Sequence, residues 1–228
     1  MPKTVSIIIP TLNEVAGIRK TIESIPIQNL KKLGYDLEIL IIDGDSKDGT
    51  IEEVKKTGTE LFIEKRRGYG RAYKTGFEKA NGEIFVTIDA DGTYPAEKIP
   101  ELLEKFKEEK LDFLTTDRFH SMKKGSMSAR NKLGNAVLSI TAKTLFGIPF
   151  NDSQSGMWIL TKDAWNKVKD SVLSDGMAFS QELKIEMYRN KLKCKEIGIE
   201  YDVRFGKPKL NPWKDGINNL LHLLKKRI

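Results

Sequence analysis

Short apolar runs alternate with longer amphipathic segments along the chain. The runs at residues 5–9, 37–42, 60–64 and 84–88 have the length and β-branched composition of buried strands. Apolar residues recur at helical spacing over about 15–25, from about 50, up to 80 and over about 95–109. Strands and helices that alternate in this way predict an α/β fold with a mainly parallel, doubly wound sheet.

The second half of the chain continues with further strands and helices. We predict a strand at 111–116 that Asp117, Arg118 and Phe119 close, a second strand at 157–160 and an extended segment at 194–203. Helices are expected over 130–146, from about 163 and from about 180. Ser180 is the candidate N-cap of the last of these, with Glu182 in its first turn.

Two predicted helices have apolar faces that could contact either the rest of the protein or a lipid membrane. For the helix over 130–146 we expect core packing, with contact to a lipid or membrane as the alternative, through Leu133, Val137, Ile140 and Leu145. For the C-terminal helix, docking on the domain is favoured over an interfacial position, through Ile217, Leu220, Leu221 and Leu224. We expect one domain over 1–210 and an amphipathic helix over 211–228.

Composition narrows the class of protein. The 228 residues suit one α/β domain, and a net charge of +7 is compatible with phosphates, anionic lipid or nucleic acid as partners, or with a lysine-rich soluble surface. The single cysteine excludes an internal disulfide, and two histidines exclude a histidine-rich zinc site. The sequence begins without a signal-peptide pattern and has no bilayer-spanning apolar run, so we expect a cytoplasmic protein with at most peripheral membrane contact.

Two acidic residues follow the predicted strand at 84–88. Asp89 and Asp91 are separated by one residue and precede Gly92, Thr93 and a proline. At the carboxyl end of a strand in an open α/β sheet, both carboxylates can reach one hard cation, so a bound diphosphate would complete a Mg²⁺ or Mn²⁺ site. Ordinary turn chemistry is the alternative.

Polar residues also follow the first two predicted strands. After the first strand, Thr11 or Asn13 can cap the next helix, and Glu14 lies near its positive end. After the second strand, Asp43 opens a loop of acids and glycines whose carboxylates can accept from a ribose hydroxyl or a base N–H. The glycines of this loop are equally consistent with plain turns.

A basic loop follows the third predicted strand. Residues 65–74 interleave three arginines and two lysines with two glycines, and include Arg67, Gly68 and Arg71. Glycines let a backbone approach a diphosphate, and arginines bind phosphate bidentately. The P-loop spacing is absent. A solvated, basic helix start is the alternative.

Together these motifs resemble the family 2 glycosyltransferases of the GT-A fold, and within them the polyprenyl (dolichyl) phosphate sugar synthases. Seven motifs carry the resemblance: P-T-L-N-E at 10–14, D-G-D-S-K-D-G-T at 43–50, R-G-Y-G-R-A at 67–72, D-A-D-G-T-Y-P at 89–95, D-S-Q-S-G at 152–156, F-S-Q-E at 179–182 and R-F-G-K-P-K at 204–209. The last three, with Arg118, point to the lipid-phosphate branch. The chain departs from the pattern at Gly44, at Met157-Trp158 and at Pro208.

The resemblance implies a role for each group of residues. The nucleotide sugar would contact Pro10, Asn13, Glu14, Asp43, Asp45, Arg67, Gly68, Arg71, Asp89, Ala90 and Asp91. The metal, Mg²⁺ or Mn²⁺, would lie on Asp89 and Asp91, and Gln181 with Glu182 would lie at the sugar end. The acceptor or its phosphate would contact Arg118, Arg130, Asp152, Ser155, Arg204 and Lys209.

The implied reaction is inverting transfer of a hexose from a nucleoside-diphosphate sugar, GDP-mannose or a UDP-sugar, to polyprenyl or dolichyl phosphate. A second hypothesis is a sugar hydroxyl acceptor with Glu182 or Asp152 as the base. A third is a non-catalytic basic module that binds nucleotide or anionic membrane. Acids clustered at strand ends would repel nucleic acid, so we expect no nucleic-acid partner. The oligomeric state stays open.

Overall fold

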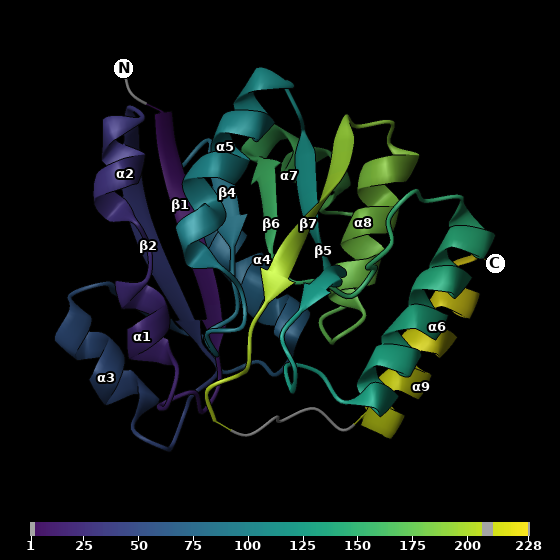
Figure 1. Ribbon diagram of the computed structural model, residues 1–228, viewed down its shortest axis with the longest axis horizontal. Coiled ribbons are helices and arrows are strands. Elements are labelled where there is room, and N and C mark those ends of the chain that lie inside the picture. Colours follow the sequence, from purple (N-terminus) through teal and green to yellow (C-terminus); the bar gives the residue numbers. More distant parts are fainter. Residues whose placement is uncertain (1–2, 207–211, 228) are drawn as a thin grey trace.

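The protein is described by a computed structural model, in which residues 3–206 and 212–227 are placed. A seven-stranded sheet with the order β3-β2-β1-β4-β6-β5-β7 forms its centre (Figure 1). The strands are β1 (Lys3–Thr11), β2 (Tyr35–Asp43), β3 (Glu60–Ile63), β4 (Ile84–Thr87), β5 (Phe113–Met122), β6 (Trp158–Thr161) and β7 (Cys194–Tyr201).

The first four strands form the parallel, doubly wound half that the sequence predicts. β1 pairs in parallel with β2 on one side and with β4 on the other, and β3 extends the sheet beyond β2. All four strands therefore end at the same edge, where their C-terminal loops meet. β6 departs from this pattern, because it lies antiparallel between β4 and β5.

Helices cover both faces of the sheet. They are α1 (Ile18–Glu23), α2 (Ile27–Lys32), α3 (Thr50–Thr57), α4 (Tyr69–Lys79), α5 (Ile99–Glu108), α6 (Ala129–Phe146), α7 (Lys162–Val168), α8 (Phe179–Arg189) and α9 (Pro212–Arg227), with a 3₁₀ turn at Ala96–Lys98. β4 is buried on both faces because its alternate side chains, such as Val86 and Phe85, enter two separate cores. Such a strand has the continuous apolar pattern that made it recognisable.

Two strand and helix predictions need correction. Asp117, Arg118 and Phe119 do not close a strand, because β5 continues through them to Met122 and pairs with β7 on both sides of a register irregularity. α2 was not predicted. It is a six-residue helix and is too short to give a periodic signal.

The apolar face predicted for 130–146 was assigned to the core, and this is correct only at its C-terminal end. Leu145 packs against the core, and α6 also buries Leu138, Ser139 and Ala142. Leu133 and Ile140 are 68% and 63% exposed, and Val137 is exposed as well. Three of the four predicted core contacts are therefore wrong, because the face of α6 that packs against the protein is turned away from them.

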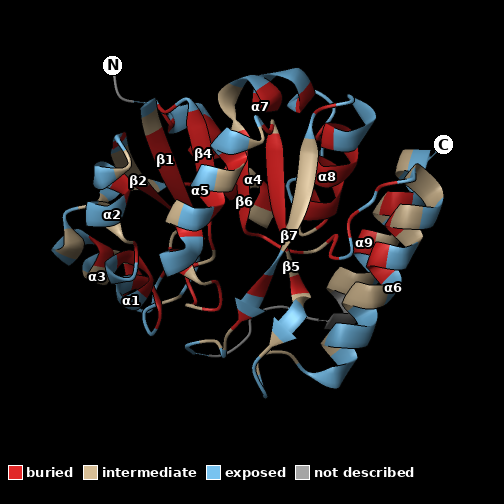
Figure 2. Ribbon diagram, turned by 45° about the horizontal axis from the view of Figure 1, so that its top comes forward, coloured by how far each residue is buried: buried red, intermediate tan, exposed pale blue. Residues whose placement is uncertain are grey.

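The C-terminal helix docks on the domain, as favoured, but of the four predicted contact residues only Leu220 packs against the core. α9 packs against α6, and the two helices lie together at one edge of the molecule (Figures 1 and 2). Asn219 and Leu223 are buried in this contact, whereas Ile217, Leu221 and Leu224 are exposed. Among the described residues, no helix is both long enough and apolar enough to cross a bilayer.

Candidate active site

Asp89 lies just beyond the end of β4, beneath two tyrosines of α4. The hydroxyls of Tyr69 and Tyr73 donate to its Oδ1 at 3.1 and 3.3 Å. Gly156, from the loop before β6, closes the other side: a Cβ on this glycine would lie 3.2 Å from Asp89 Oδ1 and 2.3 Å from the Tyr69 hydroxyl. Asp89 is therefore fixed by side chains and backbone from three segments.

Asp91 is held inside the turn that follows Asp89. Its Oδ1 accepts from the backbone N–H of Thr93 at 3.0 Å and from the Thr93 hydroxyl at 2.6 Å. Its Oδ2 is paired with the guanidinium of Arg204, which follows β7. Asp91 is 1% exposed. The end of β7 thus delivers a cation to the acidic pair.

The carboxylates of Asp89 and Asp91 repel each other when both are ionised. Burial, and next the charge of Asp91, raise the pKa of Asp89 to about 7, and Arg204 only partly offsets this. A divalent cation with oxygen ligands would relieve the same repulsion, so the residues present fit Mg²⁺ or Mn²⁺. Among the described residues, no group of three or more acidic, histidine or cysteine side chains could hold a metal ion, so diphosphate and water would have to complete the shell.

The loops after β1 and β2 are joined into one unit. Asp43 accepts from the backbone N–H and the hydroxyl of Ser46, both at 2.7 Å. The Ser46 hydroxyl in turn accepts from the Asn13 N–H at 2.7 Å, and Asn13 Oδ1 accepts from the Lys47 N–H at 2.8 Å. Neither Thr11 nor Asn13 caps α1, whose N-cap is Gly17 without a side-chain bond. Asn13 connects the two loops instead.

Both loops contain a non-glycine residue in the left-handed region, Asn13 with φ 52° and Asp45 with φ 66°. Such backbone is costly and is maintained here by the bonds between the loops. Asp45 also pairs with Lys47 at 2.7 Å. Pro10 is buried in β1 opposite Ile42, Ala90 is buried, and Glu14 is half-buried at the edge of the crevice.

The basic loop at 65–74 is only partly available to a ligand. Arg66 binds both oxygens of Glu64, at 2.9 and 2.7 Å, and its hydrogen bond is the main reason that the pKa of Glu64 falls to about 2. Arg71 contacts Glu78 at 2.9 Å. Arg67 is exposed. Of the three arginines, Arg67 is therefore the one that best fits a diphosphate.

The two glycines of this loop are needed for packing within the protein. Gly68 has φ 140°, and a Cβ there would lie 2.0 Å from the carbonyl oxygen of Asp175. A Cβ on Gly70 would lie 2.6 Å from the Cβ of Phe179. The glycines thus allow the start of α4 to approach the segment that leads into α8. The sequence had suggested that they let the backbone approach a diphosphate.

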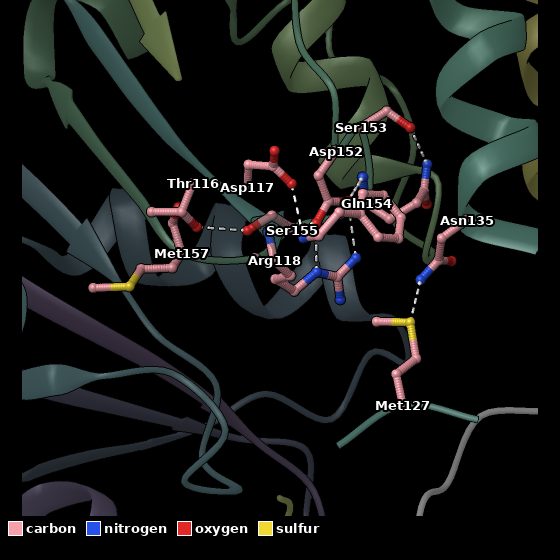
Figure 3. Close-up of polar contacts among 12 residues, drawn as sticks. Thr116, Asp117, Arg118, Met127, Asn135, Asp152, Ser153, Gln154, Ser155 and Met157 are labelled. Atoms are coloured by element: carbon pink, nitrogen blue, oxygen red, sulfur yellow. Dashed lines mark hydrogen bonds and ion pairs between the residues drawn. The ribbon is translucent and has the colours of Figure 1, made fainter. Parts of the chain in front are cut away.

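Arg118 and Asp152 form a buried, bidentate pair (Figure 3). Arg118 Nε and Nη2 donate to the two oxygens of Asp152 at 2.6 and 2.9 Å. Although burial opposes it, the attraction of Arg118 lowers the pKa of Asp152. Ser155 is also buried, and its hydroxyl lies 2.7 Å from that of Thr116. In this arrangement the three residues hold the loop at 152–156 in place. Asp152 and Ser155 are fully buried and Arg118 is 7% exposed, and their contact with an acceptor remains a prediction.

Gln181 and Glu182, in the first turn of α8, are bonded to α9. Gln181 Nε2 donates to the backbone oxygen of Asn219 at 2.8 Å. Glu182 Oε1 lies 2.8 Å from Lys226 Nζ and 3.2 Å from His222 Nε2. Burial would raise the pKa of Glu182, but the hydrogen bonds from His222 and Lys226 outweigh it and lower the pKa to about 2. Ser180 does not cap the helix, because the N-cap is Ala178.

Several site residues were missed from the sequence. Lys184 is fully buried under the 152–156 loop, where its Nζ donates to the backbone oxygens of Asp152 and Ser155 at 2.5 and 3.2 Å, and burial lowers its pKa to about 8. The hydroxyl of Tyr94 accepts from the Gly156 N–H at 2.6 Å. Side-chain bonds between residues this far apart in the chain leave no local pattern. Their only signal was proximity to recognised motifs.

Two predicted acceptor contacts, Arg130 and Lys209, remain predictions. Arg130 is on the exposed surface of the first turn of α6. Lys209 falls outside the described residues. Arg204 does reach the centre, where it pairs with Asp91, and its contact with an acceptor remains a prediction.

Comparison with known proteins identifies the family. Glycosyl transferase family 2 matches residues 6–168 of the chain. The chain is 31% identical over 225 residues to the low-salt glycan biosynthesis hexosyltransferase Agl6 of Haloferax volcanii. The aligned region covers 97% of this chain but only 53% of that protein. It is 28% identical over 181 residues to the dolichyl-phosphate hexose transferase of the same organism. This alignment covers 78% of this chain and 76% of that protein.

A solved structure supports the same assignment at the level of fold. Glucosyl-3-phosphoglycerate synthase from Mycobacterium tuberculosis, in complex with Mn²⁺, UDP and glucosyl-3-phosphoglycerate, matches with a TM-score of 0.75 and 20% sequence identity, over 99% of this chain and 80% of that one. The GT-A fold expected from the sequence is thereby confirmed. Since the family match spans well over half of its length, the chain belongs to glycosyltransferase family 2.

Proposed function

We propose that this glycosyltransferase moves a hexose from a nucleoside-diphosphate sugar to a polyprenyl or dolichyl phosphate, with inversion at the anomeric carbon. The observation that carries the proposal is the state of Glu182 and Asp152. An acceptor hydroxyl would need one of them as a base, yet both are buried in ion pairs that lower their pKa values. A phosphate monoester has a second pKa of about 6 and is already ionised at neutral pH, so it needs no base.

The donor would lie along the C-terminal edge of the parallel strands. Pro10, Asn13, Glu14, Asp43 and Asp45 belong to the two joined loops and would hold the nucleoside. Ligands of open α/β sheets bind at this edge, outside the ends of the strands. Rigid loops there reduce the entropy lost on binding.

The diphosphate would lie between Asp89-Ala90-Asp91 and Arg67. A divalent cation on the two aspartates would supply charge neutralisation for the departing diphosphate. Arg204, which now pairs with Asp91, would be freed to bind a phosphate oxygen of the donor or acceptor. Bidentate contact with phosphate is chemistry that arginine favours over lysine.

The reaction balances without a proton transfer. An oxygen of the acceptor phosphate forms the new bond to the anomeric carbon, on the face opposite the leaving group. The bond from that carbon to the diphosphate oxygen breaks, and its electron pair stays with the nucleoside diphosphate. The chain's own side chains orient the two reactants and balance their negative charge, which is the main requirement for such a transfer.

The acceptor's location implies contact with a membrane, and α6 with α9 provide a suitable surface. Leu133, Val137 and Ile140 on α6 are exposed at positions i, i+4 and i+7, and Ile217, Leu221 and Leu224 repeat the spacing on α9. α6 contains three basic residues and no acidic residue, and α9 has the exposed Lys225 and Arg227 in its last turn. Apolar stripes beside basic side chains fit a bilayer with anionic lipids.

A transfer assay tests the proposal. The protein is incubated with Mn²⁺ and UDP-glucose, UDP-N-acetylglucosamine or GDP-mannose, and with polyprenyl phosphate or the matching polyprenol. We expect transfer to the phosphate and none to the alcohol. Glu182→Gln should retain transfer with a loss of about ten-fold, the effect of one lost positioning hydrogen bond, whereas loss of a general base would cost about 10²–10⁴-fold.

Two outcomes would favour the alternatives. Transfer to a hydroxyl acceptor that Glu182→Gln abolishes, with donor affinity unchanged, would support the hydroxyl-acceptor enzyme. If none of the nucleotide sugars raises the melting temperature of the protein with or without Mn²⁺, the non-catalytic module becomes the better description, because any ligand of the native state stabilises it.

A further inference from the structure

α9 buries polar as well as apolar side chains. Leu223 is buried and Leu220 packs against the core, but the polar Asn219 is only 6% exposed and the Lys226 side chain 12%, whereas the apolar Ile217, Leu221 and Leu224 are exposed. A helix that docks only for stability buries its apolar face. Burying polar groups is unfavourable unless each finds a partner, so the partners of the inner face indicate what that face does.

Several of those partners are residues of the proposed active site, although Lys226 also donates to the backbone oxygen of Ser171 at 3.1 Å. Asn219 Nδ2 donates to Gln154 Oε1 at 3.0 Å, and Gln154 Nε2 donates to Gln181 Oε1 at 2.9 Å. Lys226 bridges Glu182 and Glu186, at 2.8 and 2.9 Å. The inner face of α9 is therefore joined to the 152–156 loop and to the start of α8 by a continuous set of polar contacts.

The same face lines a cavity of about 400 Å³. Asn218, Asn219 and His222 form one wall, Ser174 and the segment before α8 another, and Tyr69 a third. Tyr69 also donates its hydroxyl to Asp89 at 3.1 Å. One side chain thus separates the cavity from the carboxylate pair proposed to hold the diphosphate.

We propose that this cavity takes the hexose of the donor, and that α9 selects which hexose is accepted. This proposal rests on the proposed function, since it places the sugar of the same donor. The family match ends at residue 168, so neither it nor the sequence motifs assign a ligand to residues 218–222.

The chemistry of the walls favours a neutral polyhydroxyl group. Amide, hydroxyl and imidazole groups both donate and accept, as sugar hydroxyls require. No lysine or arginine is among the described residues that line the cavity, which disfavours a phosphate. The volume lies within the range of small-molecule sites, about 300–1,000 Å³. A site that hydrogen-bonds a particular hydroxyl discriminates strongly against a sugar that lacks it.

Asn218 gives the sharpest test, because it lines the cavity on an exposed position of α9 and can be changed without disturbing the core. Calorimetric titration would compare UDP with UDP-glucose and UDP-N-acetylglucosamine, and GDP with GDP-mannose, all with Mn²⁺. Asn218→Ala should weaken the nucleotide sugar about five-fold through one lost hydrogen bond, while the affinity for the nucleoside diphosphate stays unchanged. Asn218→Trp, which fills the cavity, should weaken the nucleotide sugar further. Asn29→Ala, the same change on exposed α2 at the opposite edge of the sheet, is the matched control and should alter neither affinity.

The outcomes separate this proposal from the proposed function. If both Asn218 variants bind nucleotide sugars as the wild type does, the sugar does not lie against α9 and the proposal is overturned, although the transferase function stands. If both ligands weaken equally, the effect is on the nucleotide and the proposal is again overturned. If the wild-type protein binds none of the nucleotide sugars, the proposed function and the sugar pocket are both rejected.

Discussion

Arg204, which follows the last strand, pairs with the buried carboxylate of Asp91, 113 residues earlier in the chain. The backbone N–H of the next residue, Phe205, donates to the Asp91 carbonyl oxygen at 2.8 Å. The ring of Phe205 lies against Gly92, where a Cβ would come within 2.4 Å of it. The segment after β7 therefore covers the acidic turn and compensates its charge.

Replacing Arg204 by methionine should destabilise the metal-free protein. Removing one partner of a buried ion pair costs about 3–5 kcal/mol, and we expect about 2 kcal/mol because a quarter of the Arg204 side chain is exposed. At about 2–4 °C per kcal/mol for a chain of this size, the melting temperature should fall by about 4–8 °C. Differential scanning fluorimetry measures this directly.

Mn²⁺ with a nucleoside diphosphate should then reduce the difference in melting temperature between Arg204→Met and the wild type. The reason is that Mn²⁺ and the Arg204 guanidinium compensate the charge of the same carboxylates. Arg19→Met removes surface ion pairs with Glu23 and Glu53 from a side chain that is 54% exposed, and is the control, with an expected change near zero. An Arg204→Met protein as stable as the wild type without metal would contradict the assigned role of the pair.

Acid should loosen the contact between α8 and α9. The folded-state pKa of Glu182 is about 2, below its ordinary value of 4.5. Its contribution to stability is therefore fully present above pH 4.5 and is lost as the pH falls towards 2. Urea unfolding between pH 5 and pH 3 should show a smaller loss of stability for Glu182→Gln than for the wild type. Glu60→Gln, at an exposed strand position, should keep the wild-type pH dependence. The prediction would be refuted if the free energy of unfolding fell by the same amount between pH 5 and pH 3 in all three proteins.

Gly68→Ala should be strongly destabilising. The new Cβ would meet the Asp175 carbonyl 2.0 Å away, at a φ of 140° that alanine disfavours. We expect a loss of about 2–3 kcal/mol in the free energy of unfolding from combined strain and displacement. The measurement is equilibrium denaturation. Gly134→Ala on α6, where a Cβ meets nothing within 4 Å, should instead stabilise by about 0.5–1 kcal/mol because alanine favours helix. A neutral Gly68→Ala would show that the segment before α8 moves freely.

The exposed faces of α6 and α9 should bind anionic vesicles. The double change Leu133→Ser with Ile140→Ser removes two side chains that are 68% and 63% exposed, and we expect vesicle binding to fall at least about ten-fold. Sedimentation with phosphatidylserine-containing and pure phosphatidylcholine vesicles measures it. Ile63→Ser, at the end of the edge strand β3, is the matched control and should bind as the wild type does. Unchanged binding by the double variant would exclude this surface.

The parallel half of the fold was predictable because β1, β4 and the second half of β2 are buried on both faces and are followed by turns. The runs that became β1, β2 and β4 had to be strands, since four to nine apolar residues cannot form a helix that hides every side. The acids at 89 and 91 were found for the same reason, since residues after such a strand lie at the ligand edge of the sheet. The roles of Asp152 and Ser155 were not predictable, because their partners Arg118 and Thr116 come from a distant strand.

Sequence alone determined which segments are strands and helices in the first half, with the exception of the short helix α2, and it determined where the acidic pair lies and to which family the motifs belong. Each of these follows from local spacing, which short-range sterics and burial decide. The tertiary structure decided which charges are free and which are already paired, and which side of α6 and α9 faces the protein. Those outcomes depend on contacts between residues tens of positions apart, such as Asp91 with Arg204 and Glu182 with Lys226, and no periodicity within one segment encodes them.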